Sequence, residues 1–95
     1  MCRNITTLRG LEPPATAEEI EAAARQYVRK VSGVTRPTPA TEEAFEQAVS
    51  AVARATAEVL GELPPRRQPP KADPPLRRPE VRARLGLAPF DAASA

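Results

Sequence analysis

Twelve prolines limit where regular structure can form in this 95-residue chain. Proline lacks a backbone N–H and its ring clashes with the preceding turn, so a helix does not run through a proline pair. The pairs at 13–14 and 64–65 therefore bound a central segment, which Pro37 divides. Two stretches, residues 15–36 and 40–63, remain long enough for full helices. The prolines predict two helices joined by a short, stiff loop.

The first stretch carries start and stop signals of a helix. Thr16 and Glu19 have the spacing of a capping box, in which each side chain bonds the other residue's backbone N–H. Gly33 follows the last turn, where left-handed geometry commonly ends a helix. Between these signals, apolar residues recur at helical spacing: Ile20, Ala23, Ala24, Tyr27, Val28 and Val31. We expect this stripe, Tyr27 included, to lie in the core with the tyrosine hydroxyl at its edge.

The second stretch begins at Thr41, or at Thr38 with Pro39 as the first helical residue, because Thr is a favoured helix cap. Its near-heptad stripe comprises Phe45, Val49, Val52, Thr56, Val59 and Leu63. Two amphipathic helices with a short connection form an antiparallel hairpin. The lead-in, residues 1–15, carries Ile5, Leu8 and Leu11, and is expected to lie as an ordered strip on the hairpin.

From residue 64 the chain changes character. Proline pairs recur every five residues up to Pro79, which favours an extended polyproline conformation. A short helix is expected over 79–86, with proline at its start and glycine after its end. The predicted fold is all-α: a two-helix hairpin with an ordered lead-in, a proline-rich linker and a short third helix. The predicted divisions are a hairpin domain (1–63), a basic linker (64–79) and a C-terminal helix and tail (80–95).

Charge is unevenly distributed. Residues 1–63 hold seven Lys/Arg against nine Asp/Glu, whereas residues 64–95 hold seven against three. The second helix, 41–63, has five Glu and one Arg. The basic tail is interpreted as a plain linker, as a segment lying back along the acidic second helix, or as a contact for a protein or nucleic acid. Nucleic-acid binding is expected to be weak, because the tail lacks an aromatic residue before Phe90 for base stacking.

Composition argues against an enzyme. The chain has no His, which removes the commonest general base and metal ligand. Its single Cys makes no internal disulfide or thiolate-rich metal site, and its four glycines form no phosphate loop. We therefore expect no catalytic residue, no cofactor and no metal site. An apolar run of about 18 residues, which a membrane span requires, is absent, and the start does not resemble a signal peptide. A cytoplasmic location without membrane contact is expected.

The core is poor for a chain of this length. Many of its apolar residues are alanines, and it has only two Phe, one Tyr and no Trp. Small domains bury a smaller fraction of their surface and are marginally stable. We therefore expect a protein partner or a second copy of the chain, with the flanking segments, to cover the hairpin.

Two groups of polar residues are candidate contacts for a partner or an anion. Cys2 lies beside Arg3, which favours a reactive thiolate, although a buried structural thiol explains it equally. Cations gather near the hairpin bend, where they hold an anion or serve the helix end, with Arg25 pairing Glu21 at i, i+4. The candidate contacts are Cys2, Arg3, Asn4, Arg25, Arg29, Lys30, Ser32 and Arg36.

Several segments resemble a small bacterial family, the domain of unknown function 2277. The resemblance rests on the start Met-Cys-Arg-Asn-Ile, on residues 12–16 (Glu-Pro-Pro-Ala-Thr) and on residues 26–33 (Gln-Tyr-Val-Arg-Lys-Val-Ser-Gly), and it covers roughly residues 1–63. It implies no activity, substrate or partner. Relatives typically follow the hairpin with a short linker and a charged helix, whereas here the linker is expanded into proline repeats.

The function these features predict is a non-enzymatic binding or adaptor module that acts through protein contacts. One alternative is a nucleic-acid accessory protein that uses the basic tail. The other is a thiol-based sensor around Cys2.

Overall fold

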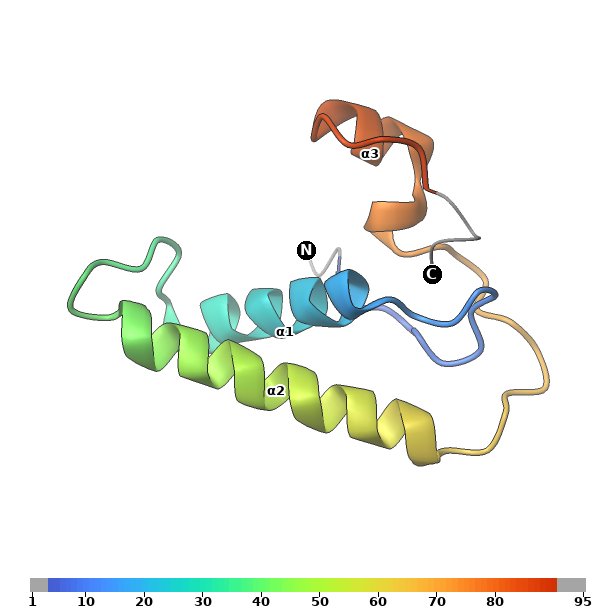
Figure 1. Cartoon of the computed structure of the whole chain (residues 1–95), viewed down its shortest axis with the longest axis horizontal. Helices are drawn as coiled ribbons and strands as arrows, with labels where there is room; N and C mark the ends of the chain where they lie inside the picture. The colour runs from blue at the N-terminus through green and yellow to red at the C-terminus, as the bar shows by residue number, and fades with distance from the viewer. Residues whose placement is uncertain (1–3, 91–95) are drawn as a thin grey trace.

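The computed structural model describes residues 4–90, and the regular secondary structure in that range is entirely helical (Figure 1). Its elements are α1 (Ala17–Ser32), α2 (Glu42–Glu62), the short 3₁₀-helix η1 (Pro75–Arg77) and α3 (Pro79–Arg84). Helices α1 and α2 run antiparallel, and the C-terminal segment passes back from the end of α2 to the start of α1 (Figure 1). The prediction of an all-α hairpin with a short third helix is confirmed.

Helix α1 begins and ends as its sequence predicts. The N–H of Glu19 donates to the Thr16 hydroxyl at 3.2 Å, and the N–H of Thr16 donates to Glu19 Oε1 at 2.8 Å. Both halves of the capping box are therefore formed. At the other end, Gly33 has φ 73° and donates its N–H to the Arg29 carbonyl at 3.0 Å. A residue with a Cβ would adopt this left-handed geometry only with strain.

Helix α2 starts differently from the expected cap. Thr41 is the N-cap residue, but its side chain accepts no bond from the first turn. Its hydroxyl instead accepts the N–H of Thr38 at 2.8 Å. The Thr38 carbonyl in turn accepts the N–H groups of Thr41 and Glu42 at 2.9 and 2.8 Å. The two threonines together close the loop before α2, so both predicted residues contribute to the start.

Two residues from each helix form the centre of the hairpin core: Ala24, Val28, Phe45 and Val49. Each of them is at most 5% exposed. Leu8 and Leu11 of the lead-in are also buried, which supports the expected ordered strip.

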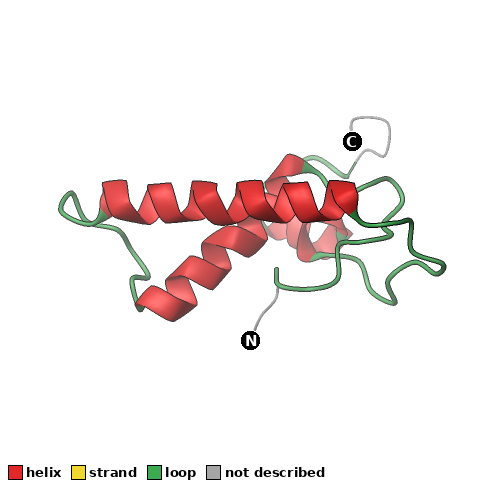
Figure 2. Ribbon diagram, turned by 90° about the horizontal axis from the view of Figure 1, so that it is seen from below, coloured by secondary structure: helices red, strands yellow, loops and turns green. Residues whose placement is uncertain are grey.

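The expectation that Tyr27 lies in the core is wrong, because its side chain is 48% exposed. Val31, one turn further along the same stripe, is 65% exposed. The last turns of α1 diverge from α2 (Figure 2), so one neighbouring helix covers only part of a wide stripe. On α2, Val59 and Leu63 are exposed as well. Both helices therefore carry apolar surface that the described fold leaves open.

The tail packs against the lead-in. One interpretation of the charges had put it along α2. The Arg9 guanidinium donates to the Pro64 carbonyl through Nη2 at 2.7 Å and Nε at 3.1 Å. Gly10 has φ 90°, and a Cβ there would lie 3.0 Å from Cβ of Arg66. The close approach and the backbone geometry both favour glycine at this position.

The linker is not extended throughout, since residues 75–77 form the 3₁₀-helix η1. Pro74 and Pro75 are buried, and so are Arg77 and Val81. The described C-terminal segment is therefore folded back onto the body. The division into three regions at residues 63 and 79 stays a prediction.

Candidate interaction face

Large apolar side chains are exposed mainly on the hairpin and its lead-in. Seven are exposed among residues 4–90: Ile5, Tyr27, Val31, Val59, Leu63, Leu85 and Leu87. The first five belong to the lead-in, to α1 and to α2 with its cap, whereas Leu85 and Leu87 follow α3. An apolar patch on the surface of a small protein commonly marks an interaction site.

A shallow groove of about 280 Å³ lies between the lead-in, α1 and α2. Its lining consists of Ile5, Thr6, Leu8, Ala23, Ala24, Tyr27, Val52, Thr56 and Leu60. No acidic or basic side chain takes part. We call this groove, together with the neighbouring Val59 and the C-cap residue Leu63 of α2, the apolar face.

The apolar face combines small side chains with larger exposed ones. Ala23 on α1 and Thr56 on α2 are small and half-buried, so a neighbouring backbone can approach closely. Interaxial distances between packed helices are roughly 8–10 Å and depend on the side chains at the contact. Ile5 and Tyr27 stand partly exposed beside these small residues and provide larger contact area.

Arg25, one of the predicted contacts, is engaged within the hairpin. Its guanidinium donates to both carboxylate oxygens of Glu46 at 2.7 and 2.9 Å and lies 5.8 Å from the centre of the Phe45 ring. Glu21, the partner expected at i, i+4, is 3.8 Å away. Arg25 therefore links α1 to α2 beside the core.

This pairing shifts both ionisation equilibria. The hydrogen bond from Arg25 lowers the pKa of Glu46 below its ordinary value, and the attraction of the positive charge adds to the shift. The same hydrogen bond raises the pKa of Arg25. A carboxyl group with a lowered folded-state pKa stabilises the fold above its unfolded-state pKa. That contribution disappears as the pH falls through the folded-state value.

Glu46→Gln is therefore expected to lower the melting temperature at neutral pH and to have no effect in acid, below the lowered pKa of Glu46. Thermal unfolding of both proteins across this pH range measures the difference. Glu43→Gln is the matched control, because Glu43 is exposed on the same helix three residues earlier and forms no ion pair among the described residues. A loss of stability that persists in acid would contradict the ion-pair explanation.

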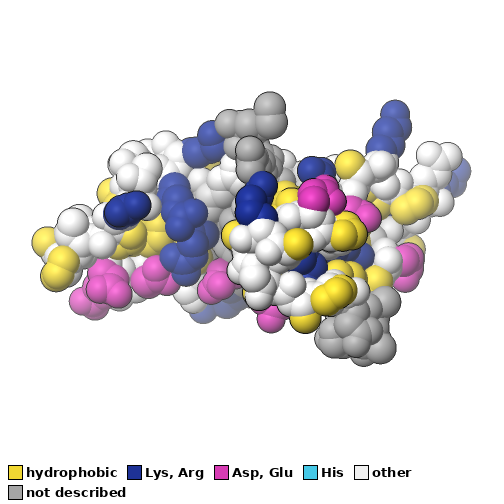
Figure 3. Space-filling model, turned by 90° about the horizontal axis from the view of Figure 1, so that it is seen from above, with side chains coloured by type: hydrophobic (Ala, Val, Ile, Leu, Met, Phe, Trp, Pro, Cys, Tyr) yellow, Lys and Arg dark blue, Asp and Glu magenta, His cyan; other side chains and the backbone are white. Residues whose placement is uncertain are grey.

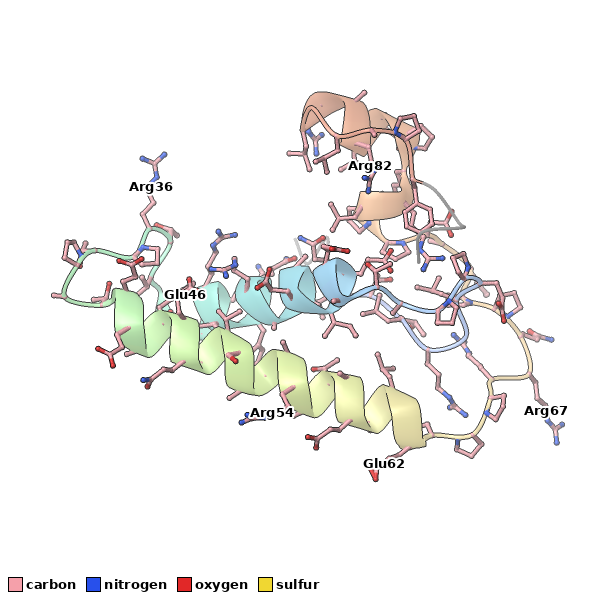
Figure 4. The ribbon with its side chains drawn as sticks, viewed as in Figure 1. Arg36, Glu46, Arg54, Glu62, Arg67 and Arg82 are labelled. Carbon is pink, nitrogen blue, oxygen red and sulfur yellow. The ribbon has the colours of Figure 1, made fainter. Side chains whose placement is uncertain are left out.

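The other predicted contacts at the bend are not gathered into one site. The Ser32 hydroxyl donates to the Val28 carbonyl at 2.6 Å and accepts the N–H of Val34 at 3.1 Å. Arg29 and Lys30 are exposed on the last turns of α1. Arg36 projects from the loop away from the body (Figure 4). Arg25 and Ser32 are bonded within the chain. An anion site at the bend stays a prediction, supported only by the exposed cations Arg29, Lys30 and Arg36.

Of the predicted contacts at the start of the chain, Cys2 and Arg3 lie outside the described residues. Asn4 lies inside them, and its backbone N–H donates to Gln26 Oε1 at 2.7 Å. This bond attaches the lead-in to α1 beside Tyr27.

A buried ion pair joins the tail to α1, which the sequence did not predict. Arg77 donates through Nε to Glu19 Oε2 at 2.7 Å and through Nη2 to Glu19 Oε1 at 3.1 Å. The two side chains are only 5% and 1% exposed. Nη2 also donates to the carbonyls of Pro13 and Pro14 at 2.6 and 3.1 Å. One guanidinium thus holds together the lead-in, α1 and the tail.

The end of the described chain closes over this pair. The Phe90 ring lies 4.7 Å from the Arg77 guanidinium and 5.9 Å from that of Arg82. Arg82 donates to the Leu76 carbonyl at 2.8 Å and also to the Ala88 carbonyl. Two of the seven tail cations are therefore committed to the fold. We call residues 75–90, held in this way, the C-terminal unit.

The remaining charges are spread over the surface. Arg67 extends away from the body, and Arg54 and Glu62 lie on the side of α2 that faces away from α1 (Figure 4). On the face viewed from above, Lys and Arg side chains lie beside acidic ones and form no single continuous patch (Figure 3). No helix within residues 4–90 has the length and hydropathy to cross a membrane. The same residues contain no cluster of possible metal ligands.

The comparisons with known proteins identify a family and no function. The family model described as an uncharacterized conserved protein (DUF2277) matches residues 1–84, so the chain belongs to this family. The match confirms the resemblance noted over residues 1–63 and extends it through the proline-rich segment and α3. No curated protein and no solved structure matches the chain.

Proposed function

We propose that this member of the family is a non-enzymatic binding module that acts through protein contacts. The observation that carries the proposal is the apolar face, where Ile5 and Tyr27 line the groove, Val59 adjoins Leu60 of its lining, and each of the three is more than 40% exposed. Burying such side chains stabilises a complex by roughly 25 cal/mol per Å² of apolar area removed from water. The occupant in this proposal is a helix, because the small side chains of Ala23 and Thr56 lie in the groove beside Ile5 and Tyr27 and let a neighbouring backbone approach.

Nucleic-acid binding by the tail is supported less well. Phosphate contacts require free Lys and Arg side chains, and Arg77 is buried against Glu19. The exposed tail cations include Arg66, Arg67 and Lys71 on the segment that packs on the lead-in. Phe90, the tail's one aromatic residue, stacks on arginine within the same chain. This arrangement favours only weak, salt-sensitive binding of nucleic acid.

The test is chemical cross-linking of the full chain to its neighbours in bacterial extract, before and after nuclease treatment. The cross-linked chain is identified, purified and titrated against the wild type and Tyr27→Glu. We expect nuclease to leave the contact intact and Tyr27→Glu to weaken it at least about 10-fold, because a carboxylate would be buried without a partner. Arg29→Glu is the matched control, since Arg29 is exposed on α1 away from the groove.

Two results would overturn the proposal. One is a contact that nuclease abolishes, which would move nucleic acid to first place. The other is a captured protein whose affinity falls as much with Arg29→Glu as with Tyr27→Glu, because the apolar face would then not be the surface that binds.

A further inference from the structure

We infer that the helix which occupies the apolar face is α2 of a second copy of this chain, packed antiparallel to the first. This inference rests on the proposed function, since it names the partner of the same face. The arguments come from the pattern of residues along α2, from the exposed area of the chain and from the positions of its charges.

An apolar stripe on α2 borders the hairpin core, with Ala48 and Val52 packed against the core and Val52 also lining the groove. Ala48, Val52, Ala55 and Val59 follow one another at intervals of four, three and four residues. Because 11 residues make about three helical turns, this stripe runs almost parallel to the helix axis. Ala48 and Val52 are half-buried, whereas Ala55 and Val59 are exposed. No described element of the chain covers the stripe completely.

The stripe is complementary to itself when two copies pair antiparallel. A two-fold axis between positions 53 and 54 brings a small residue opposite a larger one in each layer. Written as one copy against the other, the layers are Val52–Ala55, Ala48–Val59 and Ala44–Leu63. Interfaces with two-fold symmetry bring the same surface of both copies together, and alternation of large and small side chains lets facing layers interdigitate.

The exposed area of the chain is larger than a compact monomer needs. The surface is 6874 Å², whereas a compact monomer of 10.2 kDa exposes about 5300 Å². The radius of gyration is 14.2 Å, against about 12.4 Å for a compact domain of this length. The excess of about 1500 Å² exceeds the roughly 800 Å² that each partner buries in a standard interface.

None of the charged residues of α2 belongs to the stripe. Glu42, Glu43 and Glu46 lie toward the start of the helix, Arg54 lies on the side that faces away from α1 (Figure 4), and Glu58 is exposed next to Val59. Glu62 borders the stripe at its C-terminal end. Since α2 is acidic, two copies repel each other at long range. Salt screens that repulsion, so self-association is expected to persist or strengthen as salt is added.

The test is the molar mass of the full chain in solution, measured by light scattering or sedimentation over a range of concentrations. We expect twice the mass of one chain. Ala55→Glu is expected to raise the dimer dissociation constant at least about 10-fold, because it places carboxylates against apolar side chains of the second copy. The single chain keeps its fold, since Ala55 is exposed and Glu is a good helix former.

Ser50→Glu is the matched control. Ser50 is exposed on α2 and lines a cavity with Ala17, Glu18 and Ala53 on the other side of the hairpin. It adds the same charge and side chain outside the stripe, so the dimer is expected to remain. A monomer at every concentration overturns the inference, and so does equal dissociation by Ser50→Glu and Ala55→Glu.

Cross-linking tests the antiparallel register. In a Cys2→Ser background, chains with Val52→Cys are mixed with chains with Ala55→Cys and oxidised. A disulfide forms when the two Cβ atoms lie about 3.5–4.5 Å apart. The antiparallel layers predict cross-links between the two kinds of chain and few within either kind. Preferential cross-linking of Val52→Cys to itself would overturn the antiparallel arrangement.

Failure of this inference is distinguishable from failure of the proposed function. A monomeric chain whose capture of a different protein is still abolished by Tyr27→Glu refutes the second copy and keeps the protein-binding module. A chain that neither dimerises nor loses any protein contact on Tyr27→Glu refutes both.

Discussion

Arg77→Ala is expected to destabilise the folded chain by about 3–5 kcal/mol, because removal of one partner leaves the other charge of a buried ion pair unpaired. Glu19 is 3% exposed and would keep only the backbone bond from Thr16 among the contacts described. The carbonyls of Pro13 and Pro14 would lose the same donor. Denaturant unfolding followed by helical circular dichroism measures the loss.

Arg78→Ala is the control for this substitution. Arg78 is the next residue, is exposed, and its side chain donates only to the Asp73 carbonyl among the described contacts, at 3.1 Å. Its removal is expected to change stability by less than about 0.5 kcal/mol, as at most surface positions. Equal effects of the two substitutions would contradict the role assigned to Arg77. Limited proteolysis adds a local readout, since Arg77→Ala is expected to release the C-terminal unit and expose it to cleavage.

Phe45→Ala is expected to cost a similar amount, about 3–5 kcal/mol, the range for truncation of a buried phenylalanine. Phe45 is 4% exposed and packs with Ala24, Val28 and Val49, all smaller than itself. These neighbours cannot fill the space that the ring leaves. The midpoint of denaturant unfolding, compared with that of the wild type, measures the effect.

Leu85→Ala is the control for Phe45→Ala, since Leu85 is a large apolar residue that is 55% exposed. It is expected to lower stability by less than about 1 kcal/mol. A loss below that limit for Phe45→Ala would mean that the core is not centred on this ring.

The helices were predictable because their signals are local. Thr16 and Glu19 cap α1 three residues apart, and Gly33 ends it, so no distant contact had to be known. Phe45 could be assigned to the core from the spacing of the α2 stripe. The same spacing failed for Tyr27, because the stripe gives the face of a helix but not how much of that face a neighbour covers.

The Glu19–Arg77 pair could not be predicted for a different reason. The two residues are 58 positions apart, and Arg77 is one of five cations in a repetitive proline-rich segment. Nothing local distinguishes it from Arg66 or Arg78. In the sequence, the capping box alone accounted for Glu19, although its carboxylate accepts hydrogen bonds from both the Thr16 N–H and the Arg77 guanidinium. One of the interpretations of the charges put the tail along α2, whereas Arg9 and Arg77 hold it against the lead-in and α1.

The apolar face could be predicted from the sequence only in part. Ile5, Tyr27 and Val59 were all recognised as apolar positions, and the small core predicted that a partner or a second copy was required. Their exposure depends on how much of each apolar stripe the neighbouring elements cover, which sequence spacing does not specify.

The central claim is that this chain binds another protein chain through its apolar face. The salt dependence of that affinity tests the claim most directly. The account predicts a dissociation constant that changes little, or falls, as salt is raised, because apolar burial is not screened. Phosphate contacts by several cations would instead weaken binding steeply, with a slope of about −0.9 per contact on logarithmic axes. Such a slope, unaffected by Tyr27→Glu, would contradict a module that acts through protein contacts.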